Sequence, residues 1–317
     1  MNKVVFPTFN LEFEFSPIAI EFGNLQIYWY SICIVSGIVI SLILMYFSNK
    51  KHGIKYEKII EIMIFTLIFG IIGARIFYVV FNLDYYLNNI SEIFNVKGGG
   101  LAIFGGIIAG AITAYIICKR RKINFLDFCD YIVPYLALSQ AIGRIGNFFN
   151  IEAYGIETNN IFRMGIETIS GYTEVHPCFL YEMIGCLLIF IILKILESKQ
   201  LCYENNKKNI QEGNTNSTCN IKKVHCKGEL FSFYLILYGT IRFLIEGVRA
   251  DSLMLLNIRI SQLIAIIMVI FGISIYINNI KCRKNSNNVD WKYHQSLSNC
   301  WFYTKNVIFY DYSGSWL

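Results

Sequence analysis

Seven long apolar runs restrict this chain to very few folds. They span Ile27–Phe47, Ile59–Phe81, Leu101–Cys118, Phe125–Ile142, Cys178–Leu196, Leu230–Ile245 and Ile260–Ile277. A helix of about 20 apolar residues crosses the roughly 30 Å hydrocarbon core of a bilayer, and most of the runs approach that length. Backbone polar groups in lipid must be satisfied within a helix or a closed barrel, and these runs lack the alternating pattern of barrel strands. The sequence therefore predicts an all-α integral membrane protein with seven transmembrane helices.

The composition agrees with a membrane protein. Hydrophobic residues make up 55% of the 317 residues and charged residues 16%, whereas a soluble domain has about 25% charged residues. We expect one polytopic membrane domain, 1–284, which contains a flexible, Asn- and Lys-rich cytoplasmic insertion at 199–229. Residues 285–317 are expected to form a poorly ordered cytoplasmic tail. Acidic residues precede the first apolar run, so a cleavable signal peptide is not expected.

Lysine and arginine are distributed unevenly over the predicted loops. They follow the first, third, fifth and seventh runs, as Lys50, Lys51, Lys55, Lys58, Lys119, Arg120, Arg121, Lys122, Lys281, Arg283, Lys284 and the Lys-rich segment 194–227. The positive-inside rule places such loops in the cytoplasm. We therefore predict an extracytoplasmic N-terminus and a cytoplasmic C-terminus. The net charge of +6 is explained by this topology, and no nucleic-acid partner is expected.

Two arginines are difficult to explain as topological anchors. Arg144 lies in Gly143–Asn150, at the end of the fourth run, on the side where the chain has few cations. This position favours a role as a ligand for an anionic group. Arg75 lies inside the second run, where a charge costs at least about 2.5–3.5 kcal/mol. Either an acid partner that fixes helix packing or a functional site in a wet cavity would explain it.

The sixth run carries a polar stripe. Tyr238, Arg242, Glu246 and Arg249 are spaced by four, four and three residues, so they share one helix face. An internal salt bridge with a flanking arginine is one interpretation. A cavity open toward the outer leaflet is the one we favour.

Other polar and small residues are less specific. His176 precedes Pro177 at a predicted helix start, and a single histidine is more often structural than catalytic. Gly98–Gly100, Gly105, Gly106 and Gly110 suit either close helix packing or phosphate binding at a helix start. Four residues of the insertion could bind zinc, but their spacing matches no tight ligand pattern, and no metal site is expected. They are Cys202, Cys219, His225 and Cys226.

Several ordered motifs together resemble one family. The segment Gly143–Gly155 resembles the signature of the bacterial prolipoprotein diacylglyceryl transferases. The remaining motifs follow in the family's order, from about Ile27 to Ile277: Trp29-Tyr30, Gly73-Ala74-Arg75, Gly99–Ile103, His176-Pro177, Leu180–Glu182, Tyr238-Gly239, Arg242-Phe243, Glu246 and Arg249.

This resemblance implies an activity. The family transfers the sn-1,2-diacylglyceryl group from phosphatidylglycerol to the lipobox cysteine thiol of a preprolipoprotein. The products are a thioether and glycerol 1-phosphate, and the family implies no metal or cofactor. It also implies a multi-pass protein of the bacterial cell membrane with its active site toward the extracytoplasmic face. Arginine suits such chemistry because it binds phosphate bidentately.

The resemblance also implies residue roles. Arg144 and Arg242 are expected to clamp the phosphate, and Asn147, Glu152 and Gly155 to shape the site for the lipid head group. Tyr30, Tyr238 and Glu246 are expected to orient the arginines or the substrate. Relatives often carry His or Tyr where this chain has Phe104, which cannot move a proton. His176, Tyr30 or a carboxylate would then serve as the base.

One alternative function follows from the arginines alone. Seven helices with intramembrane arginines also suit a transporter of a small anion or lipid. The polar residues cluster near one face, however, whereas many carriers place them at the midplane between inverted repeats. The family resemblance is therefore preferred.

Overall fold

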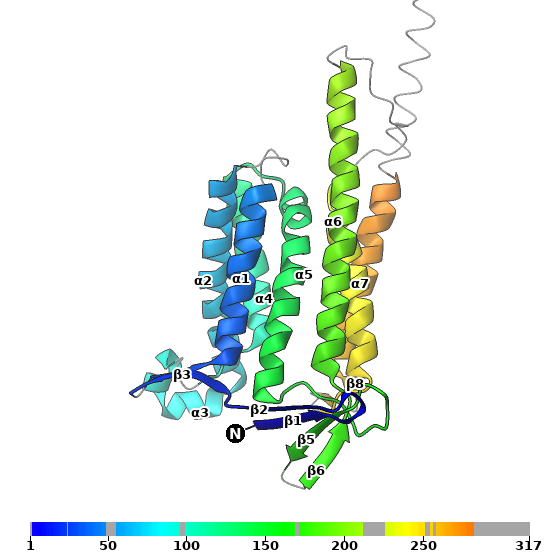
Figure 1. Ribbon diagram of the computed structural model, residues 1–317. Coiled ribbons are helices and arrows are strands. Elements are labelled where there is room, and N and C mark those ends of the chain that lie inside the picture. Colours follow the sequence, from blue (N-terminus) through cyan, green and yellow to red (C-terminus); the bar gives the residue numbers. More distant parts are fainter. Residues whose placement is uncertain are drawn as a thin grey trace, which may run out of the picture.

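Long helices form the body of the protein, and a small antiparallel sheet lies across one end of them (Figure 1). The computed structural model describes residues 2–23, 25–48, 55–95, 99–168, 171–211, 226–250, 254–255 and 258–281. The predicted tail, 285–317, lies outside these residues, as do two of the four candidate zinc ligands, Cys219 and His225. The protein is therefore mostly helical, as expected.

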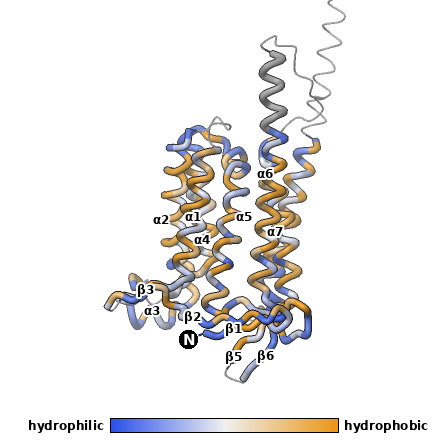
Figure 2. Tube along the Cα trace, in the orientation of Figure 1, coloured by the Kyte–Doolittle hydropathy of each residue, from blue (hydrophilic) through white to orange (hydrophobic). Residues whose placement is uncertain are grey.

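All seven predicted runs are helical. The long helices are α1 (Trp29–Ser48), α2 (Tyr56–Phe81), α4 (Ile103–Arg120), α5 (Phe125–Asn150), α6 (Cys178–Gln211), α7 (Glu229–Glu246) and a final helix, Ile260–Lys281. Within the described ranges, five helices are long and apolar enough to cross a membrane: α1, α2, α4, the Cys178–Gln200 part of α6, and the final helix. The other two, α5 and α7, are not among these five, and they carry Asp130, Arg144, Arg242 and Glu246. Figure 2 shows the apolar bodies of the helices.

The insertion predicted at 199–229 is partly helical. Helix α6 continues without interruption through Gln211, and α7 begins at Glu229. Helix α6 therefore extends into the first part of the predicted insertion, and 212–225 lie outside the described residues. The flexibility of the insertion stays a prediction.

The helices form two groups joined through α5. Helix α2 packs on α4, and α1 packs on α5, while the other face of α5 contacts α6 and α7. One apolar cluster lies among α1, α2, α4 and α5, and includes Met45, Ile62 and Tyr131. A second lies among α5, α6 and α7, and includes Ile189 and Leu193. Because α5 contributes to both clusters, its side chains can reach residues of both groups.

The glycines of α4 serve close helix packing. A Cβ added at Gly105 would lie 2.4 Å from the carbonyl oxygen of Gly73, and one added at Gly73 would lie 2.2 Å from the Cβ of Ala109. Such distances are shorter than real contacts, so α2 and α4 approach each other only because these residues are small. For Gly105, the packing interpretation is therefore correct.

The sheet was not predicted, and the all-α expectation is wrong for this part of the chain. It has the order β2-β1-β5-β6 and is antiparallel throughout, from β1 (Asn2–Phe6), β2 (Leu11–Phe15), β5 (Met164–Thr168) and β6 (Gly171–Val175). Val4 stands opposite Phe13 on one side and Ile166 on the other. The buried face of the sheet packs on Phe179 near the start of α6. Its position therefore depends on the same helix start that carries the site described below.

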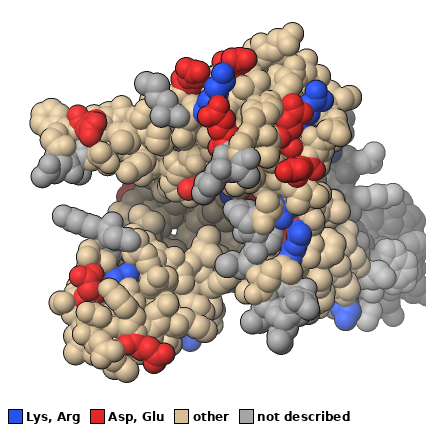
Figure 3. Space-filling view, turned by 90° about the horizontal axis from the view of Figure 1, so that it is seen from below, with Lys and Arg blue, Asp and Glu red and all other residues tan. Residues whose placement is uncertain are grey.

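Short elements complete the connections at this end. They are the 3-10 helix η1 (Pro7–Phe9), the pairs β3 (Ile18–Phe22) with β4 (Leu25–Tyr28) and β7 (Met254–Leu255) with β8 (Ile258–Arg259), helix α3 (Leu83–Asn88) and the 3-10 helix η3 (Ile90–Phe94). Figure 3 views the molecule from the sheet end and shows a hollow between two lobes. Helices α5 and α7 end here and α6 begins here, which brings three helix ends together.

Candidate active site

Glu182 of α6 is the centre of a buried ionic cluster at the sheet end. Its side chain is 2% exposed. Oε1 accepts a hydrogen bond from Arg144 Nη2 of α5 at 2.5 Å, and Oε2 accepts one from Arg242 Nη1 of α7 at 2.9 Å. Three helices therefore converge on one carboxylate. The two arginines whose convergence was expected do meet.

Each arginine has one further partner. Nη2 of Arg242 lies 2.9 Å from Oε2 of Glu246, which is 1% exposed. Nη1 of Arg144 donates to Oδ1 of the buried amide Asn147 at 3.2 Å. The cluster thus combines two cations with two anions, because a buried charge must be paired. Both arginines lie within about two turns of the C-terminal ends of their helices.

Two tyrosines of α7 support Glu182. Tyr238 donates from its hydroxyl to Glu182 Oε1 at 3.2 Å. Its ring stacks on that of Tyr234 with centroids 5.6 Å apart, and the Tyr234 hydroxyl donates to Gln140 of α5 at 3.0 Å. Three members of the predicted stripe, Tyr238, Arg242 and Glu246, therefore lie together on α7, with the internal salt bridge of one interpretation. The fourth, Arg249, lies beyond the helix, because α7 ends at Glu246. The cavity open toward the outer leaflet stays a prediction.

Tyr30 lies against the same stretch of α5. A Cβ added at Gly146 would be 2.8 Å from Tyr30 Cδ2 and 3.0 Å from Tyr30 Cα. Gly146 thus allows the first turn of α1 to pack directly on α5. No hydrogen bond or ion pair between described residues joins Tyr30 to the arginines.

His176 and Gly155 form a neighbouring backbone crossing. The Gly155 amide donates to the carbonyl of His176 at 2.7 Å. A Cβ at Gly155 would lie 2.6 Å from the Val248 carbonyl oxygen and 2.7 Å from the His176 Cβ. The crossing therefore requires glycine. Gly155 also forms an isolated β-bridge with Arg249.

The side chains of His176 and Glu152 have partners other than the two arginines. His176 Nδ1 lies 3.3 Å from the Tyr181 hydroxyl. Glu152 accepts a hydrogen bond from Asn150 at 3.2 Å, in an exposed position. Within the described part of the chain, no hydrogen bond or ion pair connects His176 or Glu152 to Arg144 or Arg242. Of the expected site residues, the structure therefore joins Arg144, Asn147, Tyr238, Arg242 and Glu246 directly.

Glu182 is the residue that sequence reasoning missed. It follows Pro177 by about one helical turn and ends the family motif Leu180–Glu182, but it is not among the predicted site residues. Its signal in the sequence was a carboxylate near the start of an apolar run, where a charge needs a partner. Its two arginine partners are 38 and 60 residues away in the chain, so their identity could not be read from local spacing.

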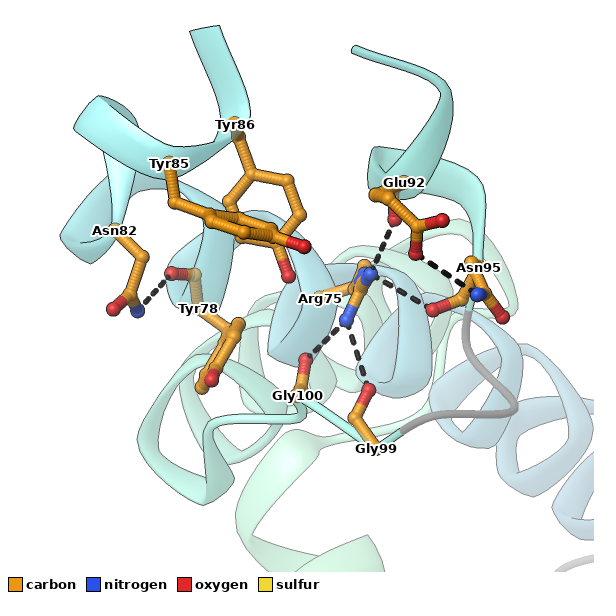
Figure 4. Close-up of a pocket in the computed structure, with 9 residues that line it drawn as sticks. All are labelled: Arg75, Tyr78, Asn82, Tyr85, Tyr86, Glu92, Asn95, Gly99 and Gly100. Carbon is orange, nitrogen blue, oxygen red and sulfur yellow. Dashed lines mark hydrogen bonds between the residues drawn. The ribbon is translucent and has the colours of Figure 1, made fainter. Parts of the chain in front are cut away.

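Arg75 does not belong to this cluster (Figure 4). It is 8% exposed, and its guanidinium donates five hydrogen bonds of 2.6–2.9 Å to main-chain carbonyls, those of Glu92, Ile93, Asn95, Gly99 and Gly100. All five of its N–H groups are thereby used. Arg75 is therefore a structural residue, as one interpretation held. Its partners are carbonyl oxygens, however, and not the expected acid.

The contacts of Arg75 also indicate the role of Gly99 and Gly100, the glycines before α4. A Cβ at Gly100, whose φ is +73°, would lie 2.4 Å from Arg75 Nη1. The carbonyls of Gly99 and Gly100 face the cation, which argues against phosphate binding by these two residues. Arg75, Glu92 and three tyrosines (Tyr78, Tyr85 and Tyr86) line a pocket of about 430 Å³ here, together with Asn82, Asn95, Gly99 and Gly100.

Comparison with known proteins identifies the family. A family model described as prolipoprotein diacylglyceryl transferase matches residues 17–278. The chain belongs to this family. The resemblance seen in the sequence motifs is thereby confirmed. Members of the family are transferases, so the arginine cluster lies in an enzyme.

Several curated relatives are named as transferases of this family. A phosphatidylglycerol–prolipoprotein diacylglyceryl transferase of Finegoldia magna is 39% identical over 260 residues, which cover 82% of this chain and 94% of the relative. Proteins with that name from Clostridium novyi and Clostridioides difficile are also 39% identical, over 84% and 86% of this chain and 97% and 98% of their own lengths. The similarity thus covers nearly the whole of each relative.

Proposed function

We propose that this transferase moves the diacylglyceryl group of phosphatidylglycerol to the cysteine thiol of a prolipoprotein lipobox. The convergence of Arg144 and Arg242 on Glu182, in a chain of this family, is the observation that carries the proposal. A cationic pair in a buried, three-helix site suits a phosphodiester, because arginine matches phosphate geometry with paired N–H donors. The competing transporter function is not favoured by the family match.

The reaction places increasing negative charge on the phosphate. The thiol sulfur forms a bond to the glyceryl carbon, and the bond from that carbon to the phosphate oxygen breaks with its electron pair. The phosphodiester, which carries one negative charge, thereby becomes a phosphomonoester that can carry two. The proton lost by the thiol balances this extra charge. Arginines already in place would stabilise the transition state more than the bound lipid.

The remaining polar residues have proposed roles around this centre. Asn147, Glu152 and Gly155 are proposed to shape the head-group site, Asn147 by holding the Arg144 guanidinium. Tyr238 and Glu246 are proposed to orient the arginines. The position before Gly105 is occupied by Phe104, which lacks a titratable group. His176 and Tyr30 are therefore proposed to handle the thiol proton in a lipid-bound complex.

We further propose that α5 and α7 also cross the membrane, which gives seven spans with the sheet on the extracytoplasmic side of the cell membrane. At the sheet end, Lys3 is paired with Glu12, and Arg163 with Glu174. The opposite end carries the basic segment 119–122, with four consecutive cations. The positive-inside rule assigns that opposite end to the cytoplasm. The cluster would then open toward the leaflet where translocated lipobox segments emerge.

A peptide lipidation assay tests the proposed reaction. Purified protein would be mixed with a lipobox peptide and vesicles of phosphatidylglycerol, without any ion gradient. We expect the peptide mass to rise by one diacylglyceryl group, with one glycerol 1-phosphate released per peptide. Phosphatidylcholine vesicles should give no product. Peptide left unmodified by folded wild-type protein would refute the function.

Matched arginine variants test the site. Arg144→Ala should lower turnover by at least about 10²-fold, a size typical of losing one donor to a developing charge. The control is Arg163→Ala. Arg163 also lies at the sheet end, but it pairs with Glu174 and not with the cluster. This variant should keep turnover close to that of the wild type. Equal losses in both variants would contradict the assignment of Arg144.

A further inference from the structure

A neutral pair of side chains, Gln140 and Tyr234, lies next to the charged cluster. Tyr234 of α7 is 4% exposed, and its hydroxyl donates to Gln140 Oε1 of α5 at 3.0 Å. Gln140 precedes Arg144 by four residues, and Tyr234 precedes Tyr238 by four, so each shares a helix face with a residue of the cluster. This neutral pair therefore joins α5 to α7 one helical turn farther from the sheet than the cluster does.

The neutral pair is connected to the cluster through one aromatic stack. The ring of Tyr234 lies nearly parallel to that of Tyr238, with an interplanar angle of 5° and centroids 5.6 Å apart. The Tyr238 hydroxyl donates to Glu182 Oε1 at 3.2 Å. A continuous series of contacts therefore runs from Gln140 through two rings to the carboxylate that both arginines share.

The hydrogen bond between Tyr238 and Glu182 depends on how one ring is oriented. The two arginines are attracted to the carboxylate by charge, which acts over a wide range of directions. A hydroxyl, in contrast, forms a hydrogen bond only within a narrow range of distance and angle. The ring of Tyr234 packs against Tyr238 from the preceding turn. Tyr234 is itself held at both ends, by the backbone of α7 and by Gln140.

A second buried tyrosine provides a comparison for a purely structural bond. Tyr131 of α5 is 2% exposed, and its hydroxyl donates to the main-chain oxygen of Met45 of α1 at 2.8 Å. This bond also joins two helices, but Tyr131 lies 13 residues before Arg144, which is about 20 Å along α5. Loss of either tyrosine hydroxyl leaves a buried polar group unpaired and lowers stability. Only the loss at Tyr234 should also disturb the cluster.

We infer that Gln140 and Tyr234 are positioning residues for the transfer reaction. They act on Glu182 through the ring and hydroxyl of Tyr238, and neither needs to touch the substrate. The inference rests on the proposed function, because it concerns the rate of that reaction. The transition state requires the charged groups in a fixed arrangement, so a displaced Tyr238 should lower kcat. The charges that attract the lipid remain, so KM for phosphatidylglycerol should stay almost unchanged.

Single substitutions give the first test in the lipidation assay. Tyr234→Phe keeps the ring and removes the hydroxyl, and Gln140→Met keeps the length of the side chain and removes the acceptor. Each should lower kcat by about tenfold and change KM for phosphatidylglycerol by less than about twofold. The control, Tyr131→Phe, should lower the thermal midpoint by a similar amount, but its kcat should stay within about twofold of wild type.

The double variant Tyr234→Phe/Gln140→Met separates position from stability. Replacing both partners of a buried hydrogen bond by apolar groups leaves no group unpaired, and such a change can be nearly neutral for stability. The double variant should therefore regain most of the thermal midpoint lost in the single variants. Its kcat should stay about tenfold below wild type, because the ring at position 234 is still not held at its tip.

A third comparison tests the path through Tyr238. A Tyr238→Phe protein lacks the hydroxyl that reaches Glu182, so adding Tyr234→Phe should lower its single-turnover rate by less than about twofold. A further loss as large as in the wild-type background would mean that Tyr234 acts by another path, and would refute the inference. If Tyr238→Phe forms no product, the double variant decides.

Two other results would overturn the positioning role. One is a Tyr234→Phe/Gln140→Met protein whose kcat recovers together with its thermal midpoint, which would make the neutral pair purely structural. The other is a loss of kcat in Tyr131→Phe as large as that in Tyr234→Phe, and this comparison decides the matter if the double variant does not fold. Wild-type protein that is folded but modifies no peptide would refute the proposed function instead.

Discussion

The two glycines of the Gly143–Asn147 segment should respond to alanine in opposite directions. A Cβ at Gly143 would have Ile34 Cγ1 as its nearest neighbour, at 4.0 Å, which is ordinary contact. A Cβ at Gly146 would lie 2.8 Å from Tyr30 Cδ2 and 3.0 Å from Tyr30 Cα. The ring can move away, but the Cα belongs to the backbone of α1. The same substitution on one helix thus makes an ordinary contact at Gly143 and overlaps a packed neighbour at Gly146.

The expected magnitudes follow from these contacts. Alanine in place of glycine inside a helix stabilises by about 0.5–1 kcal/mol, so Gly143→Ala should raise the free energy of unfolding by that amount. Gly146→Ala makes the same gain, but overpacking costs about 1–3 kcal/mol. The two proteins should therefore differ by about 1–3 kcal/mol, with Gly146→Ala the less stable. At roughly 2 °C for each kcal/mol in a chain of this size, the midpoints should differ by several degrees.

Thermal unfolding in one detergent, followed by circular dichroism, measures the difference. Lipidation turnover provides the second readout, because displacement of Tyr30 should lower it in Gly146→Ala and leave Gly143→Ala close to wild type. Tyr30→Ala combined with Gly146→Ala should recover only part of the stability, since the contact with the backbone remains. If Gly146→Ala were as stable as Gly143→Ala, the close packing of α1 on α5 would be refuted.

Three further changes test other parts of the structure. Arg75→Leu should cost more than about 3 kcal/mol, because carbonyls around the 92–100 loop lose their donor, and failure to lower the thermal midpoint would contradict this. Asp130→Asn should cost about 1–2 kcal/mol in the same assay, since the Asp130 carboxylate accepts from the amides of Gly228 and Phe231 at the start of α7. Burial and the Glu174 carboxylate raise the pKa of Tyr172 above 10.0, so its contribution to stability is present below pH 10 and is lost above it. Tyr172→Phe should therefore flatten the fall in midpoint as the pH rises above 10.

The helices could be predicted because their signal is local. Each run is apolar over nearly its whole length, and the structure places a helix over every one. Strand β2 carried a local signal as well, since Leu11, Phe13 and Phe15 alternate with Glu12 and Glu14. The same acids also argue against a signal peptide. Strand β5 could not be predicted in the same way, because it is paired with β1, far away in the chain.

The site was predictable in its residue types but not in its contacts. The four-residue spacing of Tyr238, Arg242 and Glu246 identified the face that the structure shows. Nothing in the sequence, however, indicated that Glu182 would be the carboxylate between the two arginines. The structural role of Arg75 was also hidden, because its acceptors are main-chain oxygens that every residue has. Side-chain patterns indicate which groups need partners, whereas the fold decides which partners they find.

The five carbonyls around Arg75 have a consequence for how the sequence of this protein can diverge in evolution. A cation that binds only peptide oxygens does not depend on the side chains at Glu92, Ile93 and Asn95. These three positions are therefore free to vary without weakening the attachment, while the arginine itself has no substitute with five donors. We expect them to differ among related enzymes, whereas Gly100, where a Cβ would lie 2.4 Å from Arg75, is expected to stay glycine.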